Sequence, residues 1–181
     1  MTKLSTSVDT KKLLKLIKDK NRNEIAEFVN ERFSERYIKP IKNLNPNEKL
    51  GFSIMAVSCL MIESLESFKS GLKDTKNKSK TTFIKFLTTE PEFKDFYGYE
   101  ESFYTDIRCG ILHQSESTNG WKIVRKGKLF DSQTKTINAS RFLEKLEKTL
   151  NNYTTDLKLQ NWSSNNWKNL IKKLNSIINN C

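Results

Sequence analysis

Apolar side chains recur at helical spacing along most of the chain and predict a mainly helical protein. The strongest stretch runs from Asn47 as "EKLGFSIMAVSCLMIESLESFKSGL". One stripe of this stretch comprises Leu50, Ile54, Val57, Met61, Phe68 and Leu72. Between Phe52 and Ile62 the stretch is apolar nearly all round, which is typical of a helix buried on several sides. We therefore expect a central helix that stops at Gly71.

Two amphipathic helices are expected before the central one. The first lies in "KKLLKLIKDK", where Asp9 or Thr10 can act as the N-cap. Basic amphipathic helices can lie on a membrane or on nucleic acid, but we favour packing of its apolar face onto the domain. A second helix runs from Glu24 toward Ile38, and Pro40 and Pro46 are expected to bracket a connection.

Further helices are expected after the central one. The segment "TTFIKFLTTEPEFKDF" predicts two short helices separated at Pro91. Phe103, Ile107 and Ile111 form the stripe of another helix, which we expect to pack along the central helix. Ser140 is a candidate N-cap for a further helix, and "WKNLIKKLNSIINN" predicts a final amphipathic helix.

A short extended region interrupts this helical pattern. The segment "WKIVRKGKLF" predicts two strands about a Lys-Gly turn, and "TKTIN" can add a third extended piece. Its aromatic residues, Trp121 and Phe130, suit stacking of single-stranded RNA bases, with basic neighbours along the phosphates. Those neighbours are Lys122, Arg125, Lys126 and Lys128. The alternative is that Trp121 is buried and the lysines solubilise a sheet edge.

The fold class that follows is mainly α, a helical bundle with a small β-hairpin near residues 121–137. We divide the chain into an N-terminal amphipathic helix at residues 1–22 and a helical domain at residues 23–160. A C-terminal helix at residues 161–181 is expected to pack on the same domain.

Charge and cysteine usage narrow the class of protein. The net charge is +11, which favours polyanionic partners such as nucleic acid, although the basic residues are mostly lysine. Cys59, Cys109 and Cys181 are too scattered for a metal finger or a disulfide framework. The N-terminus lacks the apolar core of a signal peptide, and we expect a cytoplasmic protein without a membrane anchor.

The candidate chemistry lies in the string "DIRCGILHQ", which holds His113, the only histidine of the chain, five residues after Arg108. Histidine exchanges protons near neutral pH, and the arginine fork matches phosphate oxygens. On an unbroken α-helix the two side chains would point about 140° apart. They can meet at one phosphate only if the helix breaks near Gly110 or if a second copy of the chain brings its own pair alongside.

This string resembles the RxxxxH signature of the HEPN superfamily, small helical proteins that include metal-independent endoribonucleases of bacterial defence and toxin–antitoxin systems. The resemblance implies a HEPN-like bundle in which Arg108 and His113 are catalytic, without cofactor or metal. It also implies RNA as substrate, a two-fold homodimer, and a cognate antitoxin or defence-system protein as a further partner. The family often has Asn, Asp or His where this chain has Cys109.

Three supporting residues are expected around this pair. Glu63 or Glu66 can anchor Arg108 by a bidentate contact, and Glu63 is our candidate supporting residue. The alternative for both glutamates is a solvated helix face. The other two expected supporting residues are Tyr104, which precedes Arg108, and Gln114, which follows His113.

Two other readings compete with an endoribonuclease. The same fold without catalysis would be an RNA- or nucleotide-binding or dimerisation module, because fold alone does not confer activity. Alternatively, Cys109 and His113 lie four residues apart on one helical face and would suit a thiol hydrolase.

Overall fold

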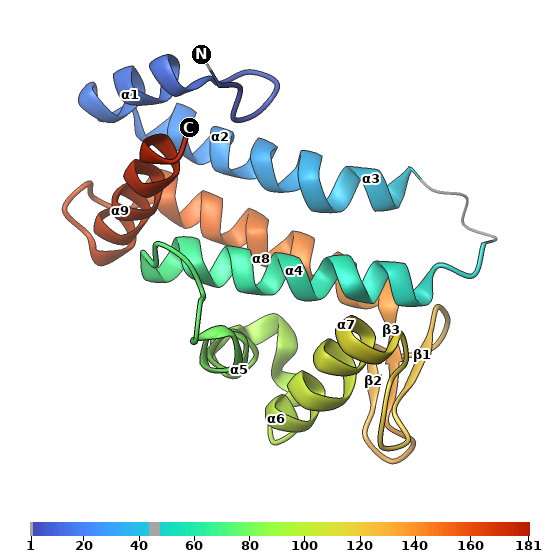
Figure 1. Cartoon of the computed structure of the whole chain (residues 1–181). Coiled ribbons are helices and arrows are strands. Elements are labelled where there is room, and N and C mark those ends of the chain that lie inside the picture. The colour runs from blue at the N-terminus through green and yellow to red at the C-terminus, as the bar shows by residue number, and fades with distance from the viewer. Residues whose placement is uncertain (1, 44–47) are drawn as a thin grey trace.

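The computed structural model describes residues 2–43 and 48–181, and most of these residues lie in helices (Figure 1). The helices are α1 (Thr10–Lys18), α2 (Arg22–Phe33), η1 (Ser34–Ile38), α3 (Lys39–Lys42), α4 (Gly51–Ser70), α5 (Ser79–Thr89), η2 (Pro91–Phe96), α6 (Glu100–Ser102), η3 (Phe103–Cys109), α7 (Gly110–Gln114), α8 (Ala139–Leu159) and α9 (Asn165–Asn179). The strands are β1 (Lys122–Val124), β2 (Phe130–Asp131) and β3 (Thr136–Asn138). The prediction of a mainly α protein with a small sheet after His113 is confirmed.

The central helix is α4, which packs against α8, α5 and α9. It ends where predicted, because Gly71 adopts the left-handed conformation, with φ of 65°, that closes a helix C-terminus. A side chain at Gly71 would also meet the backbone of Asn169 in α9 at 2.9 Å. As expected, α4 is buried on several sides, although Phe52 is 37% and Leu60 55% exposed on its remaining face.

By length and mean hydropathy α4 also meets the criteria for a membrane span, although 56% of that window is buried inside the structure. Its packing against three other helices accounts for the apolar composition.

Helices α1 and α9 add their apolar faces to the same core as α4 and α8. Leu13 and Leu16 of α1 are buried, as are Trp167 and Leu170 of α9, and all four belong to one continuous cluster. The expectation that the first helix packs onto the domain agrees with this arrangement.

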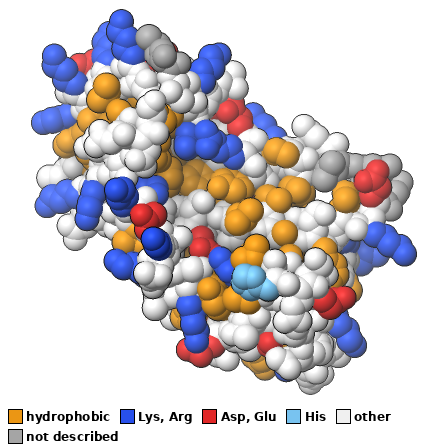
Figure 2. All heavy atoms as spheres, viewed as in Figure 1, with side chains coloured by type: hydrophobic (Ala, Val, Ile, Leu, Met, Phe, Trp, Pro, Cys, Tyr) orange, Lys and Arg blue, Asp and Glu red, His pale blue; other side chains and the backbone are white. Residues whose placement is uncertain are grey.

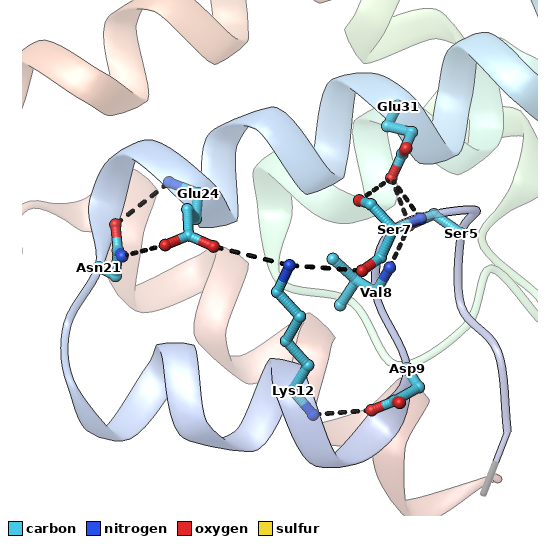
Figure 3. A network of polar contacts seen from close by, with 8 residues as sticks. All are labelled: Ser5, Ser7, Val8, Asp9, Lys12, Asn21, Glu24 and Glu31. Atoms are coloured by element: carbon cyan, nitrogen blue, oxygen red, sulfur yellow. Dashed lines mark hydrogen bonds and ion pairs between the residues drawn. The ribbon is translucent and has the colours of Figure 1, made fainter.

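Polar contacts fix the segment that precedes α1 (Figure 3). The Asp9 side chain is the N-cap of α1 and accepts a hydrogen bond from the Lys12 amide at 2.8 Å. The hydroxyl groups of Ser5 and Ser7 both donate to one oxygen of Glu31 in α2, each at 2.5 Å. Burial raises the pKa of Glu31, but these hydrogen bonds outweigh it and leave that pKa below its usual value.

The second helix begins and ends differently from the prediction. It begins at Arg22, because the side chain of Asn21 accepts a hydrogen bond from the amide of Glu24 and so caps the helix earlier. Pro40 does not lie in a connection but in α3, two residues after the end of the π-helix η1. Pro46 lies outside the described residues.

The predicted hairpin pairs different strands. The sheet order is β1-β3-β2, with β1 parallel to β3 and β2 antiparallel to β3. The hairpin therefore turns between β2 and β3, where Asp131 accepts from the amide of Gln133 and Lys135 takes a positive φ of 49°. The Lys-Gly segment is the loop that connects β1 to β2, which lie on opposite sides of β3.

The helix after the sheet begins one residue before the predicted cap. Asn138, not Ser140, is the N-cap of α8, and its side chain accepts from the Arg141 amide at 3.1 Å.

Candidate active site

The RxxxxH string crosses a change of helix type. Residues up to Cys109 belong to η3, a π-helix with wider turns, and α7 begins at Gly110. π-helical turns are uncommon and recur at functional sites. A helix break at Gly110, one of the two ways in which Arg108 and His113 could meet, does not occur, because its φ of −57° and ψ of −53° continue a right-handed helix.

Gly110 is needed for a different reason. The chain folds back after α7, and a side-chain Cβ at Gly110 would lie 2.5 Å from the carbonyl oxygen of Glu116. The glycine therefore permits a close approach of backbone to backbone, and it keeps the end of α7 against the following loop.

Arg108 is oriented by an acidic residue of the central helix. Its Nε donates to Glu63 Oε1 at 2.9 Å, and its Nη2 lies 2.8 Å from the same oxygen. The two side chains are 17% and 12% exposed. Burial lowers the pKa of Arg108, but the Glu63 carboxylate outweighs it and raises that pKa above the ordinary value.

Arg108 also contacts the aromatic ring of Tyr104. The guanidinium lies over the Tyr104 ring at 5.4 Å from its centroid, a cation–π distance. A further side-chain hydrogen bond joins Arg108 to Cys109, the next residue of the chain. The structure thus brings two of the three supporting candidates, Glu63 and Tyr104, to Arg108.

His113 and Gln114 lie at the exposed end of α7. Neither side chain forms a hydrogen bond or ion pair within the described residues, so no neighbour fixes the His113 tautomer. Figure 2 shows the histidine, in pale blue, on the surface of the molecule. The structure does not bring Gln114 to Arg108.

An apolar cavity of about 180 Å³ adjoins Arg108. Its lining comprises Ala56, Cys59, Leu60, Arg108, Ile111 and Leu112. Leu60 and Leu112 at its rim are 55% and 58% exposed. Apolar side chains gather along the middle of this face in Figure 2. Burial raises the pKa of the Cys59 thiol, which keeps this group in its protonated, unreactive form.

Sequence reasoning missed Asp106, the buried acidic residue of η3. It is 4% exposed and accepts hydrogen bonds from the side chains of Thr118 at 3.0 Å, Asn119 at 2.7 Å and Trp121 at 3.1 Å. These bonds hold the loop after His113 against η3. An acidic residue on an apolar helical stripe, followed by a polar turn, was the available signal.

The aromatic residues expected to stack on RNA bases are buried instead. Trp121 is 3% and Phe130 6% exposed, and their rings stack on each other with centroids 5.3 Å apart. The reason is that both side chains cover the helical core beside Phe103 and Phe96. The alternative reading of Trp121 as a core residue is therefore the right one.

The three predicted RNA-binding residues differ in their surroundings. Lys122 and Lys126 are exposed. Arg125 is half-buried and donates to the hydroxyl of Ser140 and to the carbonyl of Glu48. Arg125 and Lys126 also line an open cavity of about 510 Å³, together with basic residues of α8.

Neither a metal site nor a thiol hydrolase site is assembled among the described residues. Across residues 2–43 and 48–181, no three His, Cys, Asp or Glu side chains form a group able to hold a metal ion. No hydrogen bond joins Cys109 to His113 in the same residues, so the arrangement required of a thiol hydrolase is not assembled here.

Comparisons with known proteins returned nothing: no protein-family model, curated protein or solved structure matches this chain.

Proposed function

We propose that the chain is a HEPN-like, metal-independent endoribonuclease with Arg108 and His113 as its catalytic residues. One observation carries the proposal: Arg108 is held by Glu63 in a half-buried position, where it lines a cavity that a ligand can enter. A solvent-accessible histidine lies on the same helical segment. The net charge of +11 suits a polyanionic substrate. The bacterial defence or toxin–antitoxin setting belongs to the same proposal.

In the proposed reaction, the ribose 2′-hydroxyl attacks the adjacent phosphorus and the 5′-oxygen leaves. His113 takes the proton from the hydroxyl or delivers one to the leaving oxygen. Arg108 contacts the phosphate oxygens and stabilises the negative charge that grows on them. Glu63 is a positioning residue, because two contacts to one carboxylate oxygen fix the guanidinium plane.

A two-fold homodimer is part of the proposal. One Arg and one unsupported His make a sparse site, and a second copy would add its own pair. The exposed apolar face beside Arg108, which includes Phe52, Leu60 and Leu112, is a surface that a second copy can cover. Light scattering should report a dimer, and Leu60→Glu should convert it to a monomer. Leu159→Glu, at a leucine that is 78% exposed at the end of α8, is the matched control.

The direct test is cleavage of RNA by purified variants. The wild-type chain should cleave RNA in EDTA, whereas His113→Ala should be slower by about 10²- to 10⁴-fold. Arg108→Lys should also be severely impaired, because a point charge cannot reproduce the two-pronged contact. Cys109→Ser should retain most activity. A chain that loses activity with Cys109→Ser and keeps it with His113→Ala would refute the assignment.

A second candidate, an RNA-binding or dimerisation module without catalysis, is favoured by one specific feature. No neighbour among the described residues orients His113, whereas a general base is commonly oriented by a third group. The two candidates separate in one experiment. The module binds RNA with the salt dependence of phosphate contacts but leaves it intact.

A further inference from the structure

A second cluster of basic residues surrounds a small cavity where α2, η1, α4 and α9 meet. The cavity has a volume of about 170 Å³. Its polar lining consists of three cations and three hydroxyl groups: Arg32, Arg36, Lys173, Tyr37, Ser64 and Ser67. Pockets for drug-sized ligands are larger, roughly 300–1,000 Å³, so this cavity suits a single small group.

The cations are held in place by backbone carbonyls and an aromatic ring. Arg32 Nη1 and Arg36 Nη2 both donate to the carbonyl oxygen of Leu4, at 2.7 and 3.3 Å. Lys173 donates to the carbonyl of Lys73 at 3.0 Å, and its Nζ lies 5.6 Å from the centroid of the Phe68 ring. These contacts gather three positive charges without neutralising them.

The cluster has no counter-charge in contact with it. Among the described residues, no carboxylate lies within 4 Å of Arg32, Arg36 or Lys173. Arg108, by contrast, has Glu63 as its partner. The charge of Asp74 favours the protonated form of Lys173, and that of Cys181 favours the protonated form of Arg32, but neither group forms an ion pair with them.

Arg32 and Lys173 are held where their positive charge is disfavoured. Burial lowers the pKa of Arg32 to about 10, and the neighbouring Arg36 adds to this effect. Burial lowers the pKa of Lys173 as well, with a further contribution from Arg32. Partly buried like charges cost free energy, and a bound anion would offset that cost.

The cavity lies next to the candidate active site along α4. Ser64 follows Glu63 directly in the sequence, and Ser67 is four residues from Glu63 and so lies about 6 Å from it along the helix axis. Glu63 faces Arg108 and Ser64 faces Tyr37, so a strand bound at Arg108 reaches the cavity by curving round α4.

We propose that the cavity binds a phosphate group, and that its source is a phosphodiester of the RNA strand beside the scissile position. The guanidinium forks of Arg32 and Arg36 match phosphate oxygens. The Ser67 hydroxyl donates to the Ser64 carbonyl and the Ser64 hydroxyl bonds to that of Tyr37, so the three cations carry the binding. The assignment of RNA as the source rests on the proposed endoribonuclease function, whereas the phosphate site rests on the cavity alone.

The test uses the full chain and two charge-matched variants. Arg36→Gln removes an exposed cation of the cavity whose one hydrogen bond to the described residues is the 3.3 Å contact to Leu4. Lys11→Gln removes an exposed cation of α1 outside it. Thermal unfolding is followed with millimolar inorganic phosphate, and binding of a 2′-O-methyl RNA, which cannot be cleaved, is followed by fluorescence anisotropy.

The proposal expects phosphate to raise the melting temperature of the wild-type chain and of Lys11→Gln but not of Arg36→Gln. Arg36→Gln should weaken RNA binding about tenfold, with Lys11→Gln within about twofold. The salt slope of binding should fall by about 0.7 in Arg36→Gln, the value for one contact to a single strand.

Each failure has a separate meaning. Equal behaviour of the two variants in both assays overturns the phosphate site. Phosphate stabilisation that depends on Arg36, together with unchanged RNA affinity, upholds the site and overturns RNA as its source. Intact phosphate stabilisation in a chain that neither binds nor cleaves RNA refutes the proposed function and leaves the phosphate site standing.

Discussion

Asp106→Asn tests whether the buried acidic residue of η3 holds the loop that follows His113. The Asp106 Oδ1 atom accepts from Thr118 and Asn119, and Oδ2 accepts from the indole of Trp121. Asparagine keeps the shape and one oxygen, but its amide nitrogen is a donor. Whichever way the amide is turned, at least one buried donor loses its acceptor.

The magnitude follows from this count of donors. Asparagine can keep two bonds to its oxygen, which leaves the buried Trp121 N–H facing another donor. One buried, unsatisfied group costs about 1–3 kcal/mol, and the loss of charge from the remaining bonds adds about 1 kcal/mol. We therefore expect Asp106→Asn to lower the free energy of unfolding by about 2–4 kcal/mol.

Urea denaturation of a double-mutant cycle measures the effect. Trp121→Phe removes the donor that asparagine cannot satisfy, so the double variant should lose about 1–2 kcal/mol less than the sum of the two single variants. A loss below about 0.5 kcal/mol for Asp106→Asn would refute the reasoning. Strict additivity of the two changes would show that the indole bond is not the source of the loss.

Three further outcomes test other contacts. Glu63→Ala removes the partner of Arg108, and urea denaturation should show a loss of about 2 kcal/mol, between values for surface and buried pairs. Gly110→Ala forces a clash with the Glu116 carbonyl and should cost about 1–3 kcal/mol of unfolding free energy. Because its folded pKa is lowered, Glu31 stabilises the N-terminal segment above pH 4.5, and this contribution disappears as pH falls through that lowered pKa. Backbone amide chemical shifts of residues 4–8 should show this titration, and Glu31→Gln should not.

Helical periodicity was enough to predict the core elements of this chain. The stripe of α4 predicts a helix because apolar residues recur at its spacing, and Gly71 ends it through a backbone conformation that glycine adopts freely. Short strands carry much less information. Periodicity in the three residues of β1 could not show whether neighbouring Trp121 faces RNA or the core, nor that β3 lies between β1 and β2.

The candidate site was accessible from the sequence only in part. Arg108 and His113 stand out by residue type, but the choice between Glu63 and Glu66 depends on how α4 is rotated against η3. In the structure Glu63 pairs with Arg108, whereas Glu66 is buried and pairs with Lys85. Arg32 of α2 and Lys173 of α9 line the same cavity although they are far apart in the sequence. No local sequence pattern predicts such a long-range arrangement.

The central claim, attack by a ribose 2′-hydroxyl with Arg108 and His113 as the catalytic groups, is tested most directly on one matched pair of RNAs. The first is all ribose, and the second carries a single 2′-deoxynucleotide on the 5′ side of the cleaved phosphate. The account predicts that the first is cut to a 2′,3′-cyclic phosphate end, seen by mass spectrometry, and that the second is not cut there. It would be contradicted if the 2′-deoxy substrate were cleaved at the same position and rate.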